Sequence, residues 1–401
     1  MTRVTHCAHP PRRHLEESMS RTLVGLDIGS SGVRAAEFVP GRRRPTLRRF
    51  AQLPLPSGVV RAGVVADGEA LTEALKELWS KGKFGSRNVA LGVANAGVLV
   101  RQLDLDWMPP ADFRKALRYQ VQDVLPFSVD EANLDHHLLE ELDVVGEDGT
   151  ARRVARILLV AASRDMVDAF VDSARRARLR IQTVDLLPFA LLRARTPMVQ
   201  DGPAVTEAIV DVGSDVVSVV VHTAGVPRYV RMIPGVGGDS ITAAVQERYD
   251  WTWEDAERTK VYVGLPGHAH LDPSQATALS PRTDGLDHAA QQVVDAAARG
   301  LAEEISTTLD FYRDSAADQA AQAEPAGDAE ARTAGPVGRV LLTGSGAALG
   351  GFAELLGQRL AVPVDRLDAL AGVRAPGRLR LADADLPALA VPAGLCVGAA
   401  R

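Results

Sequence analysis

The 401-residue sequence predicts an α/β protein with two lobes of related architecture. A short apolar strand that ends in Asp and leads into a Gly-containing turn occurs twice, at residues 24–35 and 208–218. A second strand follows the turn in both copies, and the copies lie 184 residues apart. Since a domain typically holds about 100 to 200 residues, each copy belongs to its own lobe.

The first lobe begins with three strands that we expect to form a meander. The apolar runs at residues 22–27, 33–39 and 47–53 are separated by short loops, as in consecutive antiparallel strands. Asp67 is a suitable N-cap for a helix in which leucines recur at helical spacing. Residues 21–87 are therefore expected to form the first core.

The pattern changes at residue 88, and we expect an inserted subdomain over residues 88–180. Residues 89–93 and 98–103 are typical of two paired strands, and the sequence after Pro109 is typical of a helix that ends before Pro126. The insertion is completed by further elements, which we expect at residues 134–142 (strand), 154–161 (strand) and 164–176 (helix).

The second lobe is expected to repeat the strand order of the first, with a long helix at residues 287–312. Residues 315–338 are rich in Ala, Gly, Asp and Glu, which favours a solvated, mobile loop. The remaining elements are expected at residues 208–211, 216–222, 227–233 and 339–343 (strands) and at residues 241–249 and 353–360 (helices).

Composition and charge exclude several classes of protein. Lys and Arg number 45 against 51 Asp and Glu, so the net charge of −6 gives no attraction to nucleic acid. Two cysteines cannot form a disulfide framework, which fits a reducing cytoplasm. The longest uncharged run, residues 386–400, is interrupted by Pro and Gly and is expected to be a buried terminal segment rather than a membrane span.

The first twenty residues are basic and polar and lack the apolar stretch of a signal peptide. We expect residues 1–20 to be a disordered leader, with translation beginning at Met19.

The two Asp-Gly turns indicate a pair of phosphate-binding hairpins. A tight Gly turn lets backbone N–H groups converge on phosphate oxygens, and an Asp at the strand end can hold the water shell of a Mg²⁺ that bridges those phosphates. We therefore expect Asp27 and Asp211 to hold Mg²⁺ through water. The phosphates would lie between the turns formed by Gly29, Ser30, Ser31 and Gly32 on one side and by Gly213 and Ser214 on the other.

Other phosphate and metal motifs do not fit the sequence. No Gly-x-x-x-x-Gly-Lys-Ser/Thr motif occurs. Residues 344–350 lie between a strand and a helix, but their glycine spacing differs by one from a dinucleotide fingerprint. His268 and His270 have no acidic or Cys partner at ligand spacing, and the His and Cys residues near the N-terminus lie in the expected leader.

Taken together, these motifs resemble the PilM family of type IV pilus assembly proteins, relatives of the division protein FtsA within the actin-like ATPase superfamily. The resemblance covers nearly everything after residue 22 and is weakest at 264–287 and 315–338. It rests on residues 24–35, 107–109, 125–127, 134–135, 159–162, 184–190, 231–242, 254–260, 340–350 and 394–401. The Leu125-Pro126-Phe127 element is the most discriminating, because it belongs to the 1C subdomain that replaces subdomain 1B of actin.

The resemblance implies an actin-like ATPase fold: two lobes with ribonuclease H-like cores, a nucleotide cleft between them, and an inserted 1C subdomain. The division that it implies is residues 21–87 (1A), 88–180 (1C), 181–205 (1A), 206–240 (2A), 241–335 (2B), 336–385 (2A) and 386–401 (1A).

The resemblance also assigns site residues for ATP and Mg²⁺. By position, Asp27, Gly29, Ser30, Ser31 and Val33 resemble the first phosphate loop, and Asp211, Gly213 and Ser214 resemble the second. Gly237 and Gly238 resemble the turn beneath the nucleotide, Glu257 and Lys260 the ribose pair, and Gly344, Ser345 and Gly346 the adenosine loop. Without the resemblance, Glu257 and Lys260 would be interpreted as an exposed ion pair on a helix.

Two departures from the family pattern concern hydrolysis. Asp215 places a carboxylate in the second phosphate loop, where it would repel phosphate in the absence of a metal ion, and Ser345 stands where a third Gly is common. We therefore expect ATP binding with slow or absent hydrolysis. Asp211 is the best candidate for a catalytic base if hydrolysis occurs.

The function implied is that of a cytoplasmic ATP-binding scaffold of the type IV pilus or a related secretion machine. Its implied partner is the cytoplasmic N-terminal segment of a PilN-like inner-membrane protein, held between 1A and 1C, which would associate the chain with the membrane. Other pilus assembly proteins are further partners, and self-association is left open. The alternatives are a small-molecule kinase and an FtsA-like filament protein, which would usually have a basic amphipathic helix at its C-terminus.

Overall fold

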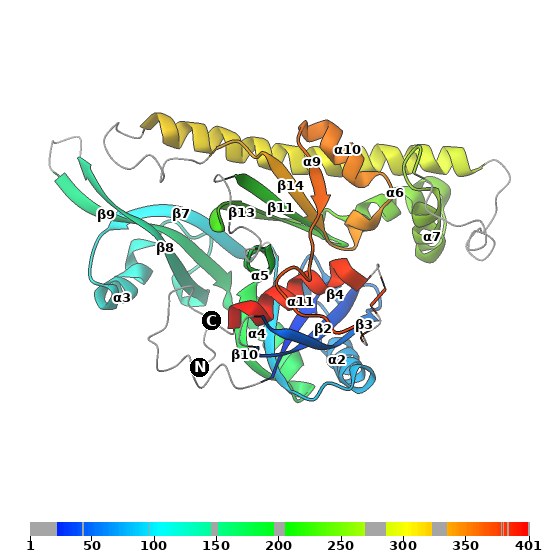
Figure 1. Cartoon of the computed structure of the whole chain (residues 1–401), viewed down its shortest axis with the longest axis horizontal. Coiled ribbons are helices and arrows are strands. Elements are labelled where there is room, and N and C mark those ends of the chain that lie inside the picture. The colour runs from blue at the N-terminus through cyan, green and yellow to red at the C-terminus, as the bar shows by residue number, and fades with distance from the viewer. Residues whose placement is uncertain are drawn as a thin grey trace.

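The computed structural model of the chain has two lobes, one above the other in Figure 1, with a smaller sheet projecting beside them. The structure describes residues 22–41, 44–95, 97–145, 151–195, 205–268, 286–322, 335–377, 379, 381–382 and 385–399. The expected leader, His270 and most of the linker between the two lobes lie outside these residues. Among the described residues, no helix is long and apolar enough to cross a membrane.

The core of lobe I is a five-stranded sheet in the order β10-β6-β1-β2-β3. Its strands are β1 (Leu23–Ile28), β2 (Gly32–Val39), β3 (Thr46–Pro54), β6 (Asn88–Val93) and β10 (Arg180–Leu186). The first three strands pair antiparallel as a meander, which confirms the sequence-based expectation. Helix α2 (Gly68–Gly82) begins after the Asp67 N-cap, whose carboxylate accepts hydrogen bonds from two backbone N–H groups at 3.0 and 2.9 Å.

Lobe II contains a second five-stranded sheet, in the order β13-β12-β11-β14-β15. Its strands are β11 (Thr206–Val212), β12 (Val216–Thr223), β13 (Val226–Pro234), β14 (Arg339–Thr343) and β15 (Val364–Arg366). Its helices are α6 (Gly238–Tyr249), α7 (Trp253–Val263), α9 (Leu286–Gln322) and α10 (Phe352–Leu360), with a short 3₁₀ turn, η3, at Gly346–Ala348. In Figure 1 the long α9 lies along the outer side of this sheet.

The two sheets have the same topology. In each, the first strand pairs antiparallel with the strand that follows it and parallel with a later strand: β1 with β2 and β6, and β11 with β12 and β14. The carboxyl ends of β1 and β11, which carry Asp27 and Asp211, therefore occupy equivalent positions in the two lobes. This arrangement confirms the expectation of two lobes with related cores.

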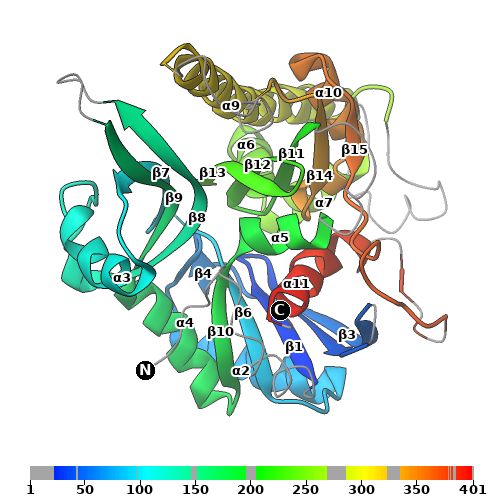
Figure 2. The ribbon, with the colours of Figure 1, turned by 60° about the vertical axis from the view of Figure 1, so that its left-hand side comes forward.

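The 1C subdomain is a three-stranded antiparallel sheet, β7-β9-β8, covered by α3 (Pro110–Gln120). Its strands are β7 (Val98–Asp106), β8 (Ala132–Val145) and β9 (Ala151–Ser163), with a 3₁₀ turn, η1, at Val129–Glu131. Phe113 and Leu117 of α3 pack with Ile157 of β9 in a small separate core. Figure 2 shows this sheet beside both lobes, and β7 contacts β13 of lobe II.

The inserted subdomain is narrower than residues 88–180. Strand β6, expected to pair with the strand after it, instead pairs parallel with β1 and β10 in the sheet of lobe I. Helix α4 (Arg164–Arg176) packs against α2, with Phe170 in the core of lobe I. Strand β6 belongs to the sheet of lobe I because five of its six residues are buried, as is typical of a central parallel strand.

Two helices end at residues other than those expected. Helix α9 continues to Gln322, so the start of the expected loop at 315–338 is helical, and residues 323–334 lie outside the described part. Helix α3 ends at Gln120, before the Pro126 that was expected to terminate it.

The last element, α11 (Leu386–Ala399), is a buried helix of lobe I, as expected of a buried terminal segment. It packs against β1 and against α5 (Leu187–Arg195), the helix that precedes the crossing into lobe II. Gly25 makes this approach possible, because a Cβ there would lie 2.8 Å from Pro392 Cα. Arg195 of α5 also donates two hydrogen bonds, of 3.1 and 3.0 Å, to the Glu207 carboxylate of β11 in lobe II.

Candidate functional site

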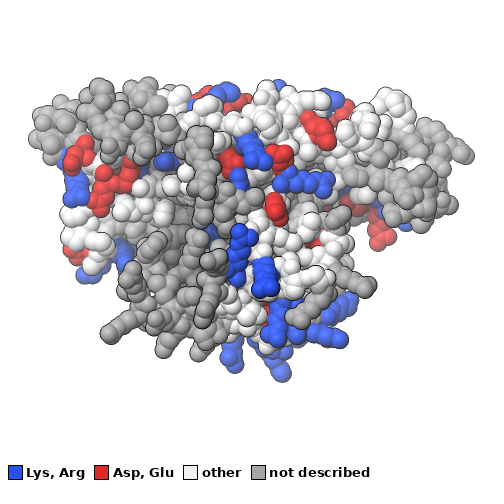
Figure 3. All heavy atoms as spheres, in the orientation of Figure 1, with Lys and Arg blue, Asp and Glu red and all other residues white. Residues whose placement is uncertain are grey.

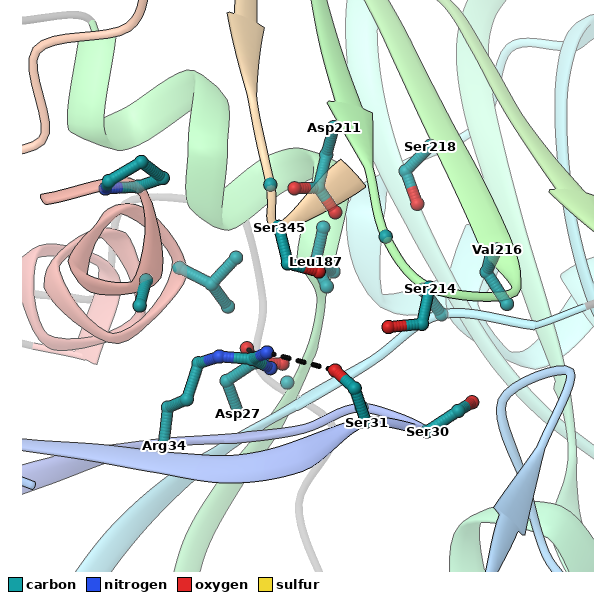
Figure 4. Close-up of a pocket in the computed structure, with 18 of the residues that line it drawn as sticks. Asp27, Ser30, Ser31, Arg34, Leu187, Asp211, Ser214, Val216, Ser218 and Ser345 are labelled. Carbon is teal, nitrogen blue, oxygen red and sulfur yellow. Dashed lines mark hydrogen bonds and ion pairs between the residues drawn. The ribbon is translucent and has the colours of Figure 1, made fainter. Parts of the chain in front are cut away.

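A cavity of about 380 Å³ lies between the lobes, where the carboxyl ends of β1, β11 and β14 meet. Figure 4 shows Asp27 entering it from lobe I and Asp211 from lobe II. Nine of the residues that sequence analysis selected line this cavity: Asp27, Gly29, Ser30, Ser31, Asp211, Gly213, Ser214, Gly344 and Ser345. Two hairpins far apart in the chain are thus brought to one space.

The β1–β2 turn forms the lobe I side of the cavity. Gly29 N–H donates to the Gly32 carbonyl at 3.0 Å, which closes the turn and exposes Ser30 and Ser31 at its tip. Asp27, at the end of β1, is 8% exposed. Val33, in contrast, is fully buried in the core and does not line the cavity.

The β11–β12 turn forms the lobe II side and is supported from below. Gly213 N–H donates to the Val216 carbonyl at 3.0 Å. The backbone N–H groups of Gly238 and Asp239 donate to the carbonyls of Gly213 and Ser214, at 2.9 and 2.7 Å. A Cβ on Gly237 would lie 2.6 Å from the Gly213 carbonyl oxygen. Gly237 and Gly238 therefore lie beneath the turn rather than in the cavity.

The turn after β14 forms the third wall. Gly344 has a φ of 93°, which favours glycine, and a Cβ there would lie 2.6 Å from Asp211 Oδ1. Ser345 follows it into the cavity, as Figure 4 shows. Gly346 does not line the cavity, and its Cα lies 3.4 Å from the position of a Cβ on Gly238. The three Gly-containing turns thus pack against one another around the aspartates.

The electrostatics of the two aspartates favour a bound cation. Burial and, to a lesser extent, the nearby Asp27 carboxylate together raise the pKa of Asp211 to about 7, against the opposing effect of Arg34. The pKa of Asp27 is also raised, chiefly by burial, against the opposing effect of Arg34. Both carboxylates therefore carry a cost of ionisation that a divalent cation would relieve.

Arg34 is a site residue that sequence reasoning missed. Its Nη1 lies 3.4 Å from Asp27 Oδ2, and its Nη2 donates to Ser31 Oγ at 3.2 Å. Figure 4 shows the guanidinium beside Asp27 at the floor of the cavity. The register of the β1–β2 hairpin could have identified Arg34 from the sequence, because it makes Arg34 the cross-strand partner of Asp27. Cross-strand neighbours on one face of a sheet lie close together.

Asp215 joins the two lobes at the edge of the cavity. It projects from the β11–β12 turn of lobe II, and its carboxylate accepts a hydrogen bond from Ser30 Oγ of lobe I. It also accepts a bond of 2.6 Å from the backbone N–H of Ala62, in the turn between the short strands β4 (Val60–Arg61) and β5 (Val64–Val65). The residue expected only to repel phosphate therefore holds the two hairpins together.

Glu257 and Lys260 of α7 form an ion pair at 2.6 Å, outside the residues that line the cavity. Lys260 Nζ also donates to the Gly238 carbonyl at 3.2 Å and to Thr242 Oγ1 at 2.8 Å, both in the first turns of α6. The Lys260 side chain is only 9% exposed. The alternative of an exposed surface ion pair is therefore wrong for Lys260, which is buried behind the turn at Gly237.

The donor set around the aspartates is too small to hold a metal ion alone. In the part of the chain that the structure describes, no group of three or more His, Cys, Asp or Glu side chains is arranged to hold a metal. A cation at Asp27 and Asp211 would complete its coordination with water and with oxygens of a bound anion, as Mg²⁺ does with phosphates.

The paired sheets, the cleft between them and the inserted 1C subdomain define an actin-like ATPase fold. A family model described as type IV pilus assembly protein PilM matches residues 25–399, so the chain belongs to the PilM family. This result confirms the resemblance seen in the sequence.

Solved structures show the same fold. The chain is similar to a PilM-PilN type IV pilus biogenesis complex, with 24% identity, 95% of this chain and 99% of that chain covered, and a TM-score of 0.74. It is also similar to the ethanolamine utilization protein EutJ from Carboxydothermus hydrogenoformans, with 16% identity, 98% and 92% of the two chains covered, and a TM-score of 0.50.

Proposed function

We propose that the chain is an ATP-binding scaffold of the type IV pilus or a related secretion machine. The observation that carries the ATP-binding part is the convergence of Asp27 and Asp211, each followed by a Gly turn, on one interlobe cavity. Backbone N–H groups suit phosphate oxygens, and buried carboxylates suit the metal ion that accompanies them. The site therefore suits a phosphate chain with its metal ion and does not suit either ligand alone.

Each part of the site has a role in this proposal. The turns at Gly29 and Gly213 present backbone N–H groups to the phosphates, with Ser30, Ser31 and Ser214 as side-chain donors. Arg34 supplies a fixed positive charge beside them. Asp27 and Asp211 hold Mg²⁺ through water, and the turn at Gly344 and Ser345 lies against the nucleoside. Lys260 and Glu257, which the family resemblance places at the ribose, support the turn at Gly237 from behind.

We propose that hydrolysis is slow or absent. Asp211 is the candidate general base, and a pKa of about 7 suits that role in the absence of metal. Asp215, however, places a further carboxylate between the hairpins, where it competes with the terminal phosphate for Ser30. A bound Mg²⁺ would also lower the pKa of Asp211 and weaken it as a base.

The second part of the proposal concerns the partner. A similar solved structure is that of a PilM-PilN complex, and we propose that this chain holds the N-terminal segment of a PilN-like inner-membrane protein between lobe I and the 1C subdomain. In the 1C sheet, β9 is central and β7 lies against lobe II, so β8 is the edge strand on the other side of the sheet. An extended peptide could pair with such an edge. Through this partner the chain would work at the inner face of the membrane with other pilus assembly proteins.

Isothermal titration with ATP and Mg²⁺ tests the nucleotide site. Binding should be detectable for the wild type and lost in Asp27→Ala and in Gly213→Glu, which places a charged side chain against the Val216 carbonyl. Asp123→Ala, which removes an exposed carboxylate of the 1C subdomain, is the matched control and should bind normally. Equal affinity in the wild type and both site variants would refute the site.

Peptide binding tests the partner. A synthetic N-terminal segment of a PilN-like inner-membrane protein should bind the wild type and bind Leu138→Glu more weakly, because Leu138 is 46% exposed on the edge strand β8. Val226→Glu alters a 37% exposed side chain of lobe II and should leave binding unchanged. Absence of binding to the wild type in every nucleotide state would refute the scaffold proposal.

A further inference from the structure

The end of lobe I opposite the cavity carries a concentration of positive charge. The register of the sheet places the starts of β1, β3, β6 and β10 at this end, since Leu23 pairs with Phe38, Phe38 with Leu47, and Arg180 with Asn88. Asp27 and Gly92, which line the cavity, lie at the other end of β1 and β6. In Figure 3, Lys and Arg side chains gather along the lower edge of the molecule, below β3 and α2 of Figure 1.

Five exposed side chains make up this basic edge: Arg48, Lys83, Arg87, Arg178 and Arg180. They come from separate segments that meet in space. Arg87 Nη1 donates to the Ala177 carbonyl at 3.3 Å, and the backbone N–H of Arg180 donates to the Arg87 carbonyl at 2.7 Å. The basic edge therefore joins the loop before β6 to the loop before β10.

Acidic residues do not neutralise the basic edge. Among the described residues 37–41, 44–49, 80–88 and 172–182 at this end of the lobe, the acidic residues are Asp172 and the buried Glu37, which pairs with Arg49 at 2.5 Å. Asp172 pairs with Arg175 at 3.5 Å, and Lys81 pairs with Glu77 of α2 at 2.6 Å. Within the described part of the chain, the five residues of the basic edge have no carboxylate partner. Lys83 follows the C-terminus of α2, where a positive charge is favourable, but helix ends do not explain Arg48 or Arg180.

The rest of the chain does not share this charge. The net charge of the chain is −6, so a cluster of Lys and Arg without carboxylate partners makes this end positive in an otherwise acidic molecule. Such a molecule orients one end toward an anionic surface. In the described part of this end Phe38 is buried, and Phe84 is partly buried and packs on Trp79, so the basic edge does not interleave with exposed aromatic rings of the kind that stack on bases. A polyanionic plane fits the basic edge better than a nucleic acid strand.

We propose that the basic edge binds the headgroups of an anionic phospholipid membrane and turns the interlobe cavity away from it. Each Lys or Arg near such a surface adds a small increment of attraction, so five together give a weak, salt-sensitive contact that adds to any tether through a protein partner. The inference uses neither the nucleotide cavity nor the peptide edge, so its test is separate from theirs.

Flotation with lipid vesicles tests this surface. The full chain should float with vesicles that contain phosphatidylglycerol, should not float with pure phosphatidylcholine vesicles, and should be released as salt is raised. A triple variant, Arg48→Glu, Lys83→Glu and Arg180→Glu, should bind the anionic vesicles about 100-fold more weakly. The matched control, Arg114→Glu, Lys115→Glu and Arg231→Glu, makes the same change in net charge at exposed positions elsewhere and should bind like the wild type.

Three results would overturn the inference. They are no flotation of the wild type with anionic vesicles at low salt, equal binding by the two triple variants, and tighter binding of the wild type to duplex DNA than to vesicles. A melting curve for each variant checks its fold, and the salt dependence of the wild type supplies a second measurement that needs no variant.

Discussion

Replacing Asp211 by Asn should stabilise the ligand-free protein at alkaline pH. The pKa of Asp211 is about 7 in the folded chain, against an ordinary value of 3.8. That difference corresponds to about 4 kcal/mol in the free energy of unfolding. Water in the open cavity screens part of this cost, so we expect about 2 kcal/mol.

The sign follows from proton binding. Between pH 4 and pH 7 the folded chain retains a proton on Asp211 that the unfolded chain has lost, so the wild type loses stability as pH rises through this window. Asn cannot ionise, so the advantage of Asp211→Asn should be small near pH 4 and reach its full size by pH 8. His222 acts in the opposite direction, because burial lowers its pKa to about 4, but it is present in both proteins and cancels in their difference.

Urea unfolding of both proteins at a series of pH values measures this difference. Asp123→Asn, which alters an exposed carboxylate, should match the wild type at every pH. Adding Mg²⁺ at pH 8 should stabilise the wild type more than Asp211→Asn, because the variant has lost one of the two carboxylates proposed to hold the ion. An Asp211→Asn protein no more stable than the wild type at pH 8, or one whose advantage does not change with pH, would refute the electrostatic reasoning.

Three further predictions follow from other contacts. Asp215→Ala removes the acceptor of the Ala62 amide and should speed hydrogen exchange at that amide. Asp215→Asn keeps an acceptor, so its Ala62 amide should exchange more slowly than that of Asp215→Ala. Equal exchange in the wild type and both variants would show that Asp215 does not hold the lobes together. Gly394→Ala should destabilise the chain by about 3 kcal/mol in thermal or urea unfolding, because its Cβ would overlap the Ala190 carbonyl, while Gly300→Ala, in open space on α9, should stabilise it by up to about 1 kcal/mol. His222→Gln should lessen the loss of stability between pH 6.5 and pH 4, where the wild-type imidazole stays neutral in the folded chain but is protonated in the unfolded one; an unchanged acid limb in unfolding curves would contradict the burial of that ring.

Local patterns in the sequence predicted the two hairpins correctly, but they did not predict how distant strands pair. The Asp-Gly turns after β1 and β11 could be predicted because strand, turn and strand are adjacent in the chain, and hairpin geometry then fixes where Asp27 and Asp211 lie. Strand β6 could not be placed, because its partners β1 and β10 are parallel and distant in sequence. Parallel pairing leaves no turn signal beside the strand.

The site residues divide in the same way. Gly29 and Gly213 were predicted from the turns that contain them. Arg34 required the register of β2 against β1, and the role of Asp215 required the other lobe, since Ser30 and the Ala62 amide are its partners. The composition of residues 386–400 predicted burial, but not that a helix containing Pro392 would pack on Gly25 of the first strand.

The position of α11 has a consequence for biosynthesis. Among the described elements, the first strand, β1, is covered by the last helix, α11, and Cys396 Sγ lies 3.8 Å from the Leu23 carbonyl oxygen. Lobe I therefore cannot complete its core until α11 has been synthesised, whereas the sheet of lobe II needs no strand after β15. A nascent chain released early would keep an open apolar groove along β1 and α5, so truncation near the C-terminus should direct the product to chaperones or proteases.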